Sequence, residues 1–122
     1  DTTVPLIPPK VATVQLPEAG SAAQISQNIL GDEVRVVSAF QNISAELLQS
    51  DYKIDCDVLV CGDKKESREE VIGLINTIGM KGWHAGVLAN SAAVEAMTSV
   101  LISINKHHSI SHSGIKVTGL KD

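Results

Sequence analysis

Two polar residues stand directly behind an extended stretch of the chain and are the first candidates for chemistry. Gln41 and Asn42 follow the stretch 33–40, whose valines give the β-branched density typical of a strand. Ligands of open α/β sheets bind beyond the carboxyl ends of the parallel strands. The pattern therefore predicts that both amides contact a ligand, and it is equally consistent with Asn42 acting only as the cap of a short following helix.

A glycine at the start of a helix is the second candidate. Gly20 precedes Ser21, and the stretch 21–24 has the form of a capping box that opens a helix ending at Gly31. Free backbone amides at such a start could hold an anion. The spacing matches neither the Gly-x-Gly-x-x-Gly pattern nor a P-loop, so plain capping is the favoured interpretation.

The cysteines and histidines are weaker candidates for functional residues. Cys56 and Cys61 are an odd number of residues apart in an extended run, which puts their side chains on opposite faces and predicts two separate thiols without a disulfide or shared metal. Serines surround the C-terminal histidines and no carboxylate or cysteine completes a ligand set near them, so surface histidines are expected there. The C-terminal histidines are His107, His108 and His112. For the remaining one, His84, a structural role is expected, with proton transfer as the alternative.

The surrounding pattern alternates between extended and helical segments. We expect helices over 21–31, 44–49, 67–79 and 91–105, and extended stretches at 1–7, 11–16, 33–40, 57–61, 83–85 and 115–120. Such alternation predicts an α/β fold with a parallel sheet and right-handed crossovers. The length of 122 residues fits one domain, residues 1–122.

Composition excludes several classes of protein. With a net charge of −4 and one residue each of Phe, Tyr and Trp, nucleic-acid binding is not expected. No apolar run approaches the ~20 residues of a membrane helix, and no signal peptide is recognisable, so we expect a cytoplasmic protein. Two cysteines are too few for a disulfide scaffold. The opening at Asp1, inside an apparent strand, favours a processed or truncated chain.

Six separated segments resemble one protein family in order and spacing. They are Asp-Thr-Thr-Val-Pro-Leu at 1–6, Leu-Pro-Glu-Ala-Gly-Ser-Ala-Ala at 16–23, Val-Val-Ser-Ala-Phe-Gln-Asn at 36–42, Asp-x-x-Val-Cys-Gly-Asp at 57–63, Ala-Gly-x-Leu-x-Asn-Ser at 85–91 and Gly-Ile-Lys at 114–116. The set resembles the NADPH-dependent deazaflavin (coenzyme F-420) oxidoreductases, in their C-terminal portion only.

That resemblance implies a fold, an activity and two cofactors. It implies the later part of a Rossmann-like dinucleotide-binding fold, with NADP bound by an N-terminal half and a deazaflavin pocket formed by the C-terminal portion. Hydride then passes directly between the two rings, so that positioning supplies most of the catalysis. Since the glycine fingerprint of the NADP half is missing, activity of this chain alone is not expected. A non-catalytic self-associating remnant and a small-ligand-binding module are the alternatives.

The resemblance also implies positions for the site residues and for contacts between copies. Those expected to bind cofactor are Thr3, Pro5, Leu6, Phe40, Gln41, Asn42, Asn90 and Thr98. Without the early strands, strand 1–7 would be an unpaired edge, and bare edges recruit partners. We therefore expect a homo-oligomer formed through strand 1–7 or through the helix 91–105.

Overall fold

The computed structural model describes residues 1–121, and a three-stranded sheet lies at its centre. The strands are β1 (Val37–Ser38), β2 (Val58–Gly62) and β3 (Gly82–His84), in the order β1-β2-β3. Strands β2 and β3 are parallel and joined through α3 (Lys65–Thr77). Strand β1 is antiparallel to β2, with Val37 opposite Gly62.

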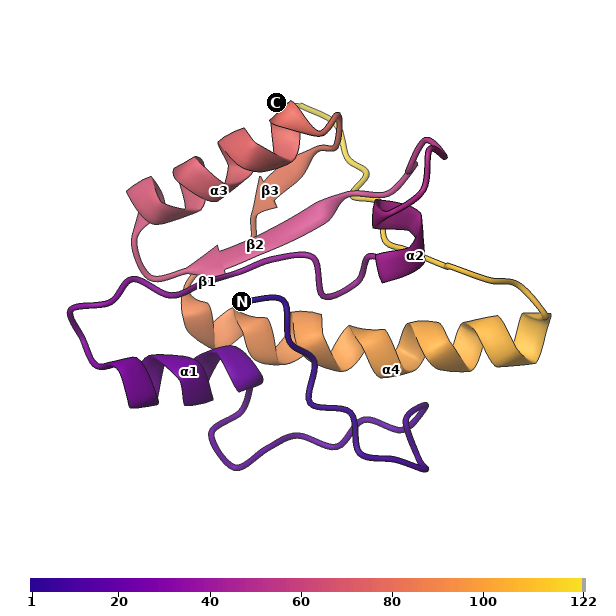
Figure 1. Cartoon of the computed structure of the whole chain (residues 1–122), viewed down its shortest axis with the longest axis horizontal. Helices are drawn as coiled ribbons and strands as arrows, with labels where there is room; N and C mark the ends of the chain where they lie inside the picture. The colour runs from indigo at the N-terminus through magenta and orange to yellow at the C-terminus, as the bar shows by residue number, and fades with distance from the viewer. Residues whose placement is uncertain (122) are drawn as a thin grey trace.

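Helices cover both faces of this sheet, as Figure 1 shows. Helix α3 lies on one side of the strands, and α1 (Ala22–Leu30) and α4 (Ser91–His108) lie on the other. A single turn of helix, α2 (Ala45–Leu48), follows β1, and the 3-10 turn η1 (Leu88–Asn90) leads into α4. The α/β class with flanking helices, predicted from the alternation of segments, is confirmed.

The core lies between the strands and α3. The buried side chains here are apolar and come from β2, α3, the segment after β1 and the loop before β3: Ala39, Ile43, Val58, Val60, Ile75 and Met80. Val58 and Val60 both have an exposed fraction of 1% or less. A β-branched run buried on both faces is typical of a central strand, and this accounts for the confirmed prediction of a strand near 57–61.

Helix α1 begins and ends where its sequence predicts. The Ser21 hydroxyl accepts a hydrogen bond from the Gln24 amide at 3.0 Å, and Gly31 closes the helix with a φ of 85°. That φ is in the left-handed region that glycine tolerates. The helix expected over 67–79 begins earlier than predicted: α3 starts at Lys65, and Ser67 is already inside its first turn.

The first twenty residues differ from the expectation of two strands. Residues 2–20 form neither helix nor strand, so the predicted strands at 1–7 and 11–16 are wrong. Only Asp1 joins the sheet: its amino group donates to the Val37 carbonyl at 2.7 Å, and its carbonyl accepts from the Ala39 amide at 3.0 Å. The two prolines at 8 and 9, which donate no hydrogen bond to a sheet, separate the exposed Leu6 and Ile7 from the rest of this segment.

Two other extended stretches are shorter than predicted or are not strands. The stretch 33–40 contributes only Val37–Ser38 to the sheet, and 115–120 forms no strand. The latter is nevertheless attached to β2, because the Ile115 carbonyl accepts from the Asp57 amide at 2.7 Å and the Asp57 carboxylate accepts from the Val117 amide at 3.0 Å. Within residues 1–121, no helix combines the length and the apolarity that crossing a bilayer requires.

Candidate functional site

The chain takes a strained turn directly after β1. Phe40 has a φ of 71°, in the left-handed region that a bulky side chain rarely adopts. The Ile43 amide donates to the Phe40 carbonyl at 3.2 Å and closes the turn. A residue held in such a conformation costs about 1–3 kcal/mol, and strain of this kind clusters at ligand sites. The turn therefore marks residues 40–43 as a candidate site.

Three of the predicted site residues meet at this turn. The Asn42 side-chain amide donates to the Val94 carbonyl at 2.9 Å and to the Thr98 hydroxyl at 3.2 Å. The Thr98 hydroxyl in turn donates to the Gln41 carbonyl at 2.7 Å. These bonds fix the turn to the middle of α4, so Gln41, Asn42 and Thr98 form one cluster.

Gln41 carries the unpaired polar atom of this cluster. Its side chain is 5% exposed, and its Nε2 donates to the Asp1 carbonyl at 3.0 Å. Its Oε1 is buried and has no hydrogen-bond partner among the described residues. Leaving a buried acceptor unpaired costs about 1–3 kcal/mol. A donor from a ligand or from another part of a larger protein would satisfy it.

A small cavity lies on the α4 side of the cluster. Its volume is about 210 Å³, which is below the roughly 300–1,000 Å³ of most small-molecule sites. The Ser113 amide donates to the Asn105 side chain at 3.2 Å, and His112 lies 3.3 Å from the Glu46 carboxylate. Polar and apolar side chains alternate around the cavity: Gln41, Asn42, Ile43, Thr98, Leu101, Asn105, His112 and Ser113.

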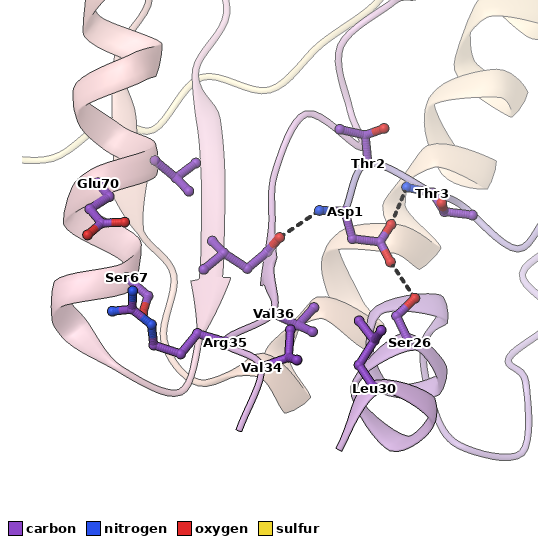
Figure 2. A pocket seen from close by; sticks show the side chains of 12 residues that line it. Asp1, Thr2, Thr3, Ser26, Leu30, Val34, Arg35, Val36, Ser67 and Glu70 are labelled. Carbon is purple, nitrogen blue, oxygen red and sulfur yellow. Dashed lines mark hydrogen bonds between the residues drawn. The ribbon is translucent and has the colours of Figure 1, made fainter. Parts of the chain in front are cut away.

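A larger groove opens beside Asp1, and Figure 2 shows its walls. Its volume is about 570 Å³, and it lies between the first three residues, α1, the segment that leads into β1, and the start of α3. The Asp1 carboxylate accepts from the Thr3 amide at 2.7 Å and from the Ser26 hydroxyl at 3.0 Å. Arg35 and Glu70 bring opposite charges to its rim.

The remaining predicted site residues are not part of this hydrogen-bonded cluster. Thr3 lines the groove beside Asp1, and Phe40 faces a separate cavity of about 270 Å³. Pro5 and Leu6 lie in the segment without a strand. Asn90 lies beyond the carboxyl end of β3, where its side chain donates to the Ala85 carbonyl at 2.9 Å.

The antiparallel direction of β1 corrects the reason given for Gln41 and Asn42. The prediction placed them at the carboxyl end of a parallel strand. Because Val37 pairs with Gly62 and Ser38 with Cys61, β1 lies beside the last residues of β2, and the chain after β1 runs towards the edge of the sheet where β2 begins. The carboxyl ends of β2 and β3, and with them Asn90, are at the other edge.

The start of α1 already holds an anion from within the chain. Glu95 on α4 is 2% exposed, and its carboxylate accepts from the Ala22 amide at 2.6 Å and the Ala23 amide at 3.4 Å. The Ser91 hydroxyl also donates to it. Glu95 was missed in the sequence, where the only signal is a carboxylate between the apolar positions Val94 and Met97. It fills the position at which an external anion was considered.

The cysteines are free thiols, as their spacing predicts. Burial raises the pKa of Cys61, and the neighbouring Ser38 side chain acts in the opposite direction. Burial and then the charge of Asp57 raise the pKa of Cys56. Both thiols are therefore poor nucleophiles at neutral pH.

The histidines lie in different environments. His107 and His108 stack edge to face at the end of α4, with ring centroids 4.8 Å apart. His84 accepts a hydrogen bond at Nδ1 from Arg68 at 3.1 Å. Among residues 1–121, no three metal-binding side chains come together.

Comparison with known proteins gives relatives along most of the chain. It is 40% identical over 114 residues to the F420-dependent NADP reductase of Methanocaldococcus jannaschii, a match that covers 92% of this chain and 51% of that protein. It is 35% identical over 106 residues to the proteins of the same name from Methanothermobacter thermautotrophicus and Methanothermobacter marburgensis, covering 84% of this chain and 46% or 47% of theirs. No protein-family model matches.

A solved structure agrees in fold. It comes from Arthrobacter sp. FB24, was provisionally described as an F420-dependent NADP reductase, and has a TM-score of 0.72 at 19% identity over 81% of this chain and 46% of that one. The class is therefore a Rossmann-like α/β unit. More particularly, the chain is homologous to the F420-dependent NADP reductases, and it spans about half the length of the curated relatives it matches.

Proposed function

We propose that this chain contributes the deazaflavin side of an F420-dependent NADP reductase and that a second, nucleotide-binding half completes the enzyme. The observation that carries the proposal is the cluster of Gln41, Asn42 and Thr98 behind the strained Phe40, in a chain 40% identical to such a reductase over 92% of its length. When both are bound, NADP and F420 supply the hydride transfer between their rings.

The residues of the cluster would hold one ring rather than react with it. Asn42 and Thr98 use their polar atoms on the protein, which fixes the turn. Gln41 keeps a buried acceptor free. Since hydride transfer needs two rings at a set distance and angle, rigid positioning is the contribution expected of this chain.

Two observations support the need for another half. The cavity at the cluster, about 210 Å³, is too small to bury a tricyclic ring by itself. The curated relatives are also about twice as long as their match to this chain. The cofactor contacts proposed for Thr3, Pro5, Leu6, Phe40 and Asn90 stay predictions, as does a cytoplasmic location.

Calorimetric titration with oxidised F420, and separately with NADP, tests this proposal. We expect measurable binding of F420 and little or none of NADP. Gln41→Ala should weaken F420 binding about tenfold, because it removes one buried hydrogen bond. Gln49→Ala, which changes an exposed glutamine at the end of α2, is the matched control. Equal F420 affinity of the two variants, with intact circular dichroism, would remove Gln41 from the site.

We also propose self-association through α4. Met97, Val100 and Ile104 are 39%, 40% and 36% exposed and recur at helical spacing along one stripe. The helix is favoured over the first seven residues because only Asp1 among them joins the sheet. Light scattering should report a dimer, and Val100→Glu should report a monomer. A strictly monomeric parent chain in dilute solution would contradict this.

The same titrations distinguish the proposed function from two alternatives. A non-catalytic remnant would dimerise through α4 and bind neither cofactor. A small-ligand module would bind a different molecule in the groove beside Asp1, and Gln41→Ala would leave that binding unchanged.

A further inference from the structure

Helix α3 begins without a side-chain cap. Its N-cap residue, Lys64, has an extended backbone and makes no side-chain hydrogen bond to the helix. The amides of residues 65–67 precede the first intrahelical bond, which the Arg68 amide makes to the Lys64 carbonyl at 3.2 Å. Three backbone donors and the positive end of a 13-residue helix therefore face the region beyond the carboxyl end of β2.

A cavity of about 240 Å³ lies at this end of the helix, and its opposite wall is the loop after α1. The Gln27 side chain holds that loop in place. It donates to the Gly31 and Val34 carbonyls at 2.8 and 2.7 Å and accepts from the Val36 amide at 3.3 Å. The loop in turn carries Arg35 to the cavity wall. Two cations and two carboxylates line the cavity: Asp32, Arg35, Asp63 and Lys64.

Ser67 brings an unpaired hydroxyl to the same cavity. The residue is 5% exposed and lines the cavity, and its Oγ has no hydrogen-bond partner within residues 1–121. Figure 2 shows Ser67 on the side of α3 that faces Arg35. Because Arg35 is exposed, its guanidinium can turn onto a ligand that reaches this hydroxyl. The uncapped amides, the hydroxyl and the guanidinium are all donors, which is the set that an oxyanion needs.

The carboxylates determine which oxyanion fits. Asp32 and Asp63 offset the charges of Arg35 and Lys64. The Leu88 amide donates to Oδ1 of Asp63 at 3.0 Å, which fixes this carboxylate just before α3. An ionised carboxylate only accepts hydrogen bonds. It therefore pairs with an anion that retains a proton, as phosphate does at neutral pH, and repels one that has none, such as sulfate.

We propose that this cavity binds a protonated phosphate group. The phosphate oxygens accept from the amides of residues 65–67, from the Ser67 hydroxyl and from Arg35, and the P–OH donates to Asp63. A volume of about 240 Å³ suits one phosphate group, free or as a phosphomonoester, and is below the roughly 300–1,000 Å³ of sites for larger ligands. The site lies at the carboxyl end of β2, whereas the chain that carries Gln41 runs towards the opposite edge of the sheet. It therefore goes beyond the function proposed above.

Titration with inorganic phosphate, followed by amide NMR spectra at constant ionic strength, tests the proposal without either cofactor. We expect saturable shifts of the amides of residues 65–67 with phosphate and none with sulfate. Ser67→Ala should weaken phosphate binding about tenfold, because one hydrogen bond to a charged group is lost, and Arg35→Gln should weaken it at least as much. The matched controls should bind phosphate as the parent does. They are Ser44→Ala, at the N-cap of α2 where the side chain makes no capping bond, and Lys106→Gln, in the last turn of α4.

Two further measurements identify the ligand. Asp63→Asn keeps the oxygen that accepts from Leu88 and adds a donor, so this variant should bind sulfate as well as phosphate. Glycerol 3-phosphate, titrated at about pH 6 where half of it is protonated, should bind if the ligand is a phosphomonoester, whereas binding of inorganic phosphate alone would make free phosphate the ligand. Shifts that do not saturate, equal binding of sulfate and phosphate by the parent chain, or equal phosphate affinity of Ser67→Ala and Ser44→Ala would overturn the proposal.

Discussion

Replacing Glu95 should destabilise the protein more than replacing a carboxylate on the surface does. Its carboxylate is 2% exposed and accepts from two amides at the start of α1 and from the Ser91 hydroxyl. Hydrogen bonds to a charged group contribute about 1.5–3 kcal/mol each, partly offset by the cost of burying the charge. The positive end of a helix adds up to ~2 kcal/mol.

From these terms we expect Glu95→Ala to lower the free energy of unfolding by about 3–4 kcal/mol. Glu95→Gln keeps the shape and one acceptor but presents an NH₂ group to backbone donors, so about 2 kcal/mol is expected. Small domains have a total of roughly 5–15 kcal/mol, so both losses are large enough to measure by urea denaturation followed by circular dichroism.

The matched control is Glu69→Gln. Glu69 is on α3, its side chain is 53% exposed, and it lies 3.8 Å from Lys65 on the next turn. Surface pairs of this kind contribute about 0–1 kcal/mol. If Glu95→Gln costs no more than Glu69→Gln, at an unchanged denaturant slope, the carboxylate does not hold α1 against α4 and the reasoning is refuted.

Three further predictions concern the strained turn, the amino group and the thiols. Phe40→Gly should be more stable than Phe40→Ala by about 1 kcal/mol in thermal melts, since only glycine tolerates a φ of 71° without strain; equal stability would count against strain. Because the pKa of the Asp1 amino group is lowered in the folded state, the unfolded chain binds more protons, so stability should rise with pH toward about 8. N-terminal acetylation should abolish that slope, and a slope that persists would contradict the assignment. Cys56 should react with iodoacetamide faster than the fully buried Cys61 in the native protein, with equal rates in urea as the control; equal native rates would indicate that Cys61 is accessible.

Local patterns in the sequence predicted the elements whose signals are short in range. Ser21 and Gly31 bound α1 because a side-chain cap and a left-handed glycine act within a few residues. The run at 57–61 identified β2 because its aliphatic side chains are buried on both faces.

Those local patterns do not predict which segments pair or pack together when they are far apart in the sequence. The direction of β1 depends on its pairing with Gly62, and nothing in residues 33–40 encodes it. Residues 1–7 have strand-like composition, yet a strand also needs a neighbour, and only Asp1 has one. The sequence predicts a surface position for Glu95. Its buried contact is with Ala22, which lies 73 positions earlier in the chain, and this contact exists only once α1 packs against α4.

Joining this chain to the part of the Methanocaldococcus jannaschii relative that it does not match gives the most direct test of the proposed role. The folded fusion should oxidise NADPH with F420 as the acceptor, and Gln41→Ala should lower kcat/KM about tenfold while Gln49→Ala leaves it unchanged. A folded fusion that binds NADPH but transfers no hydride to F420, or one in which Gln41→Ala is as active as the parent, would contradict the account.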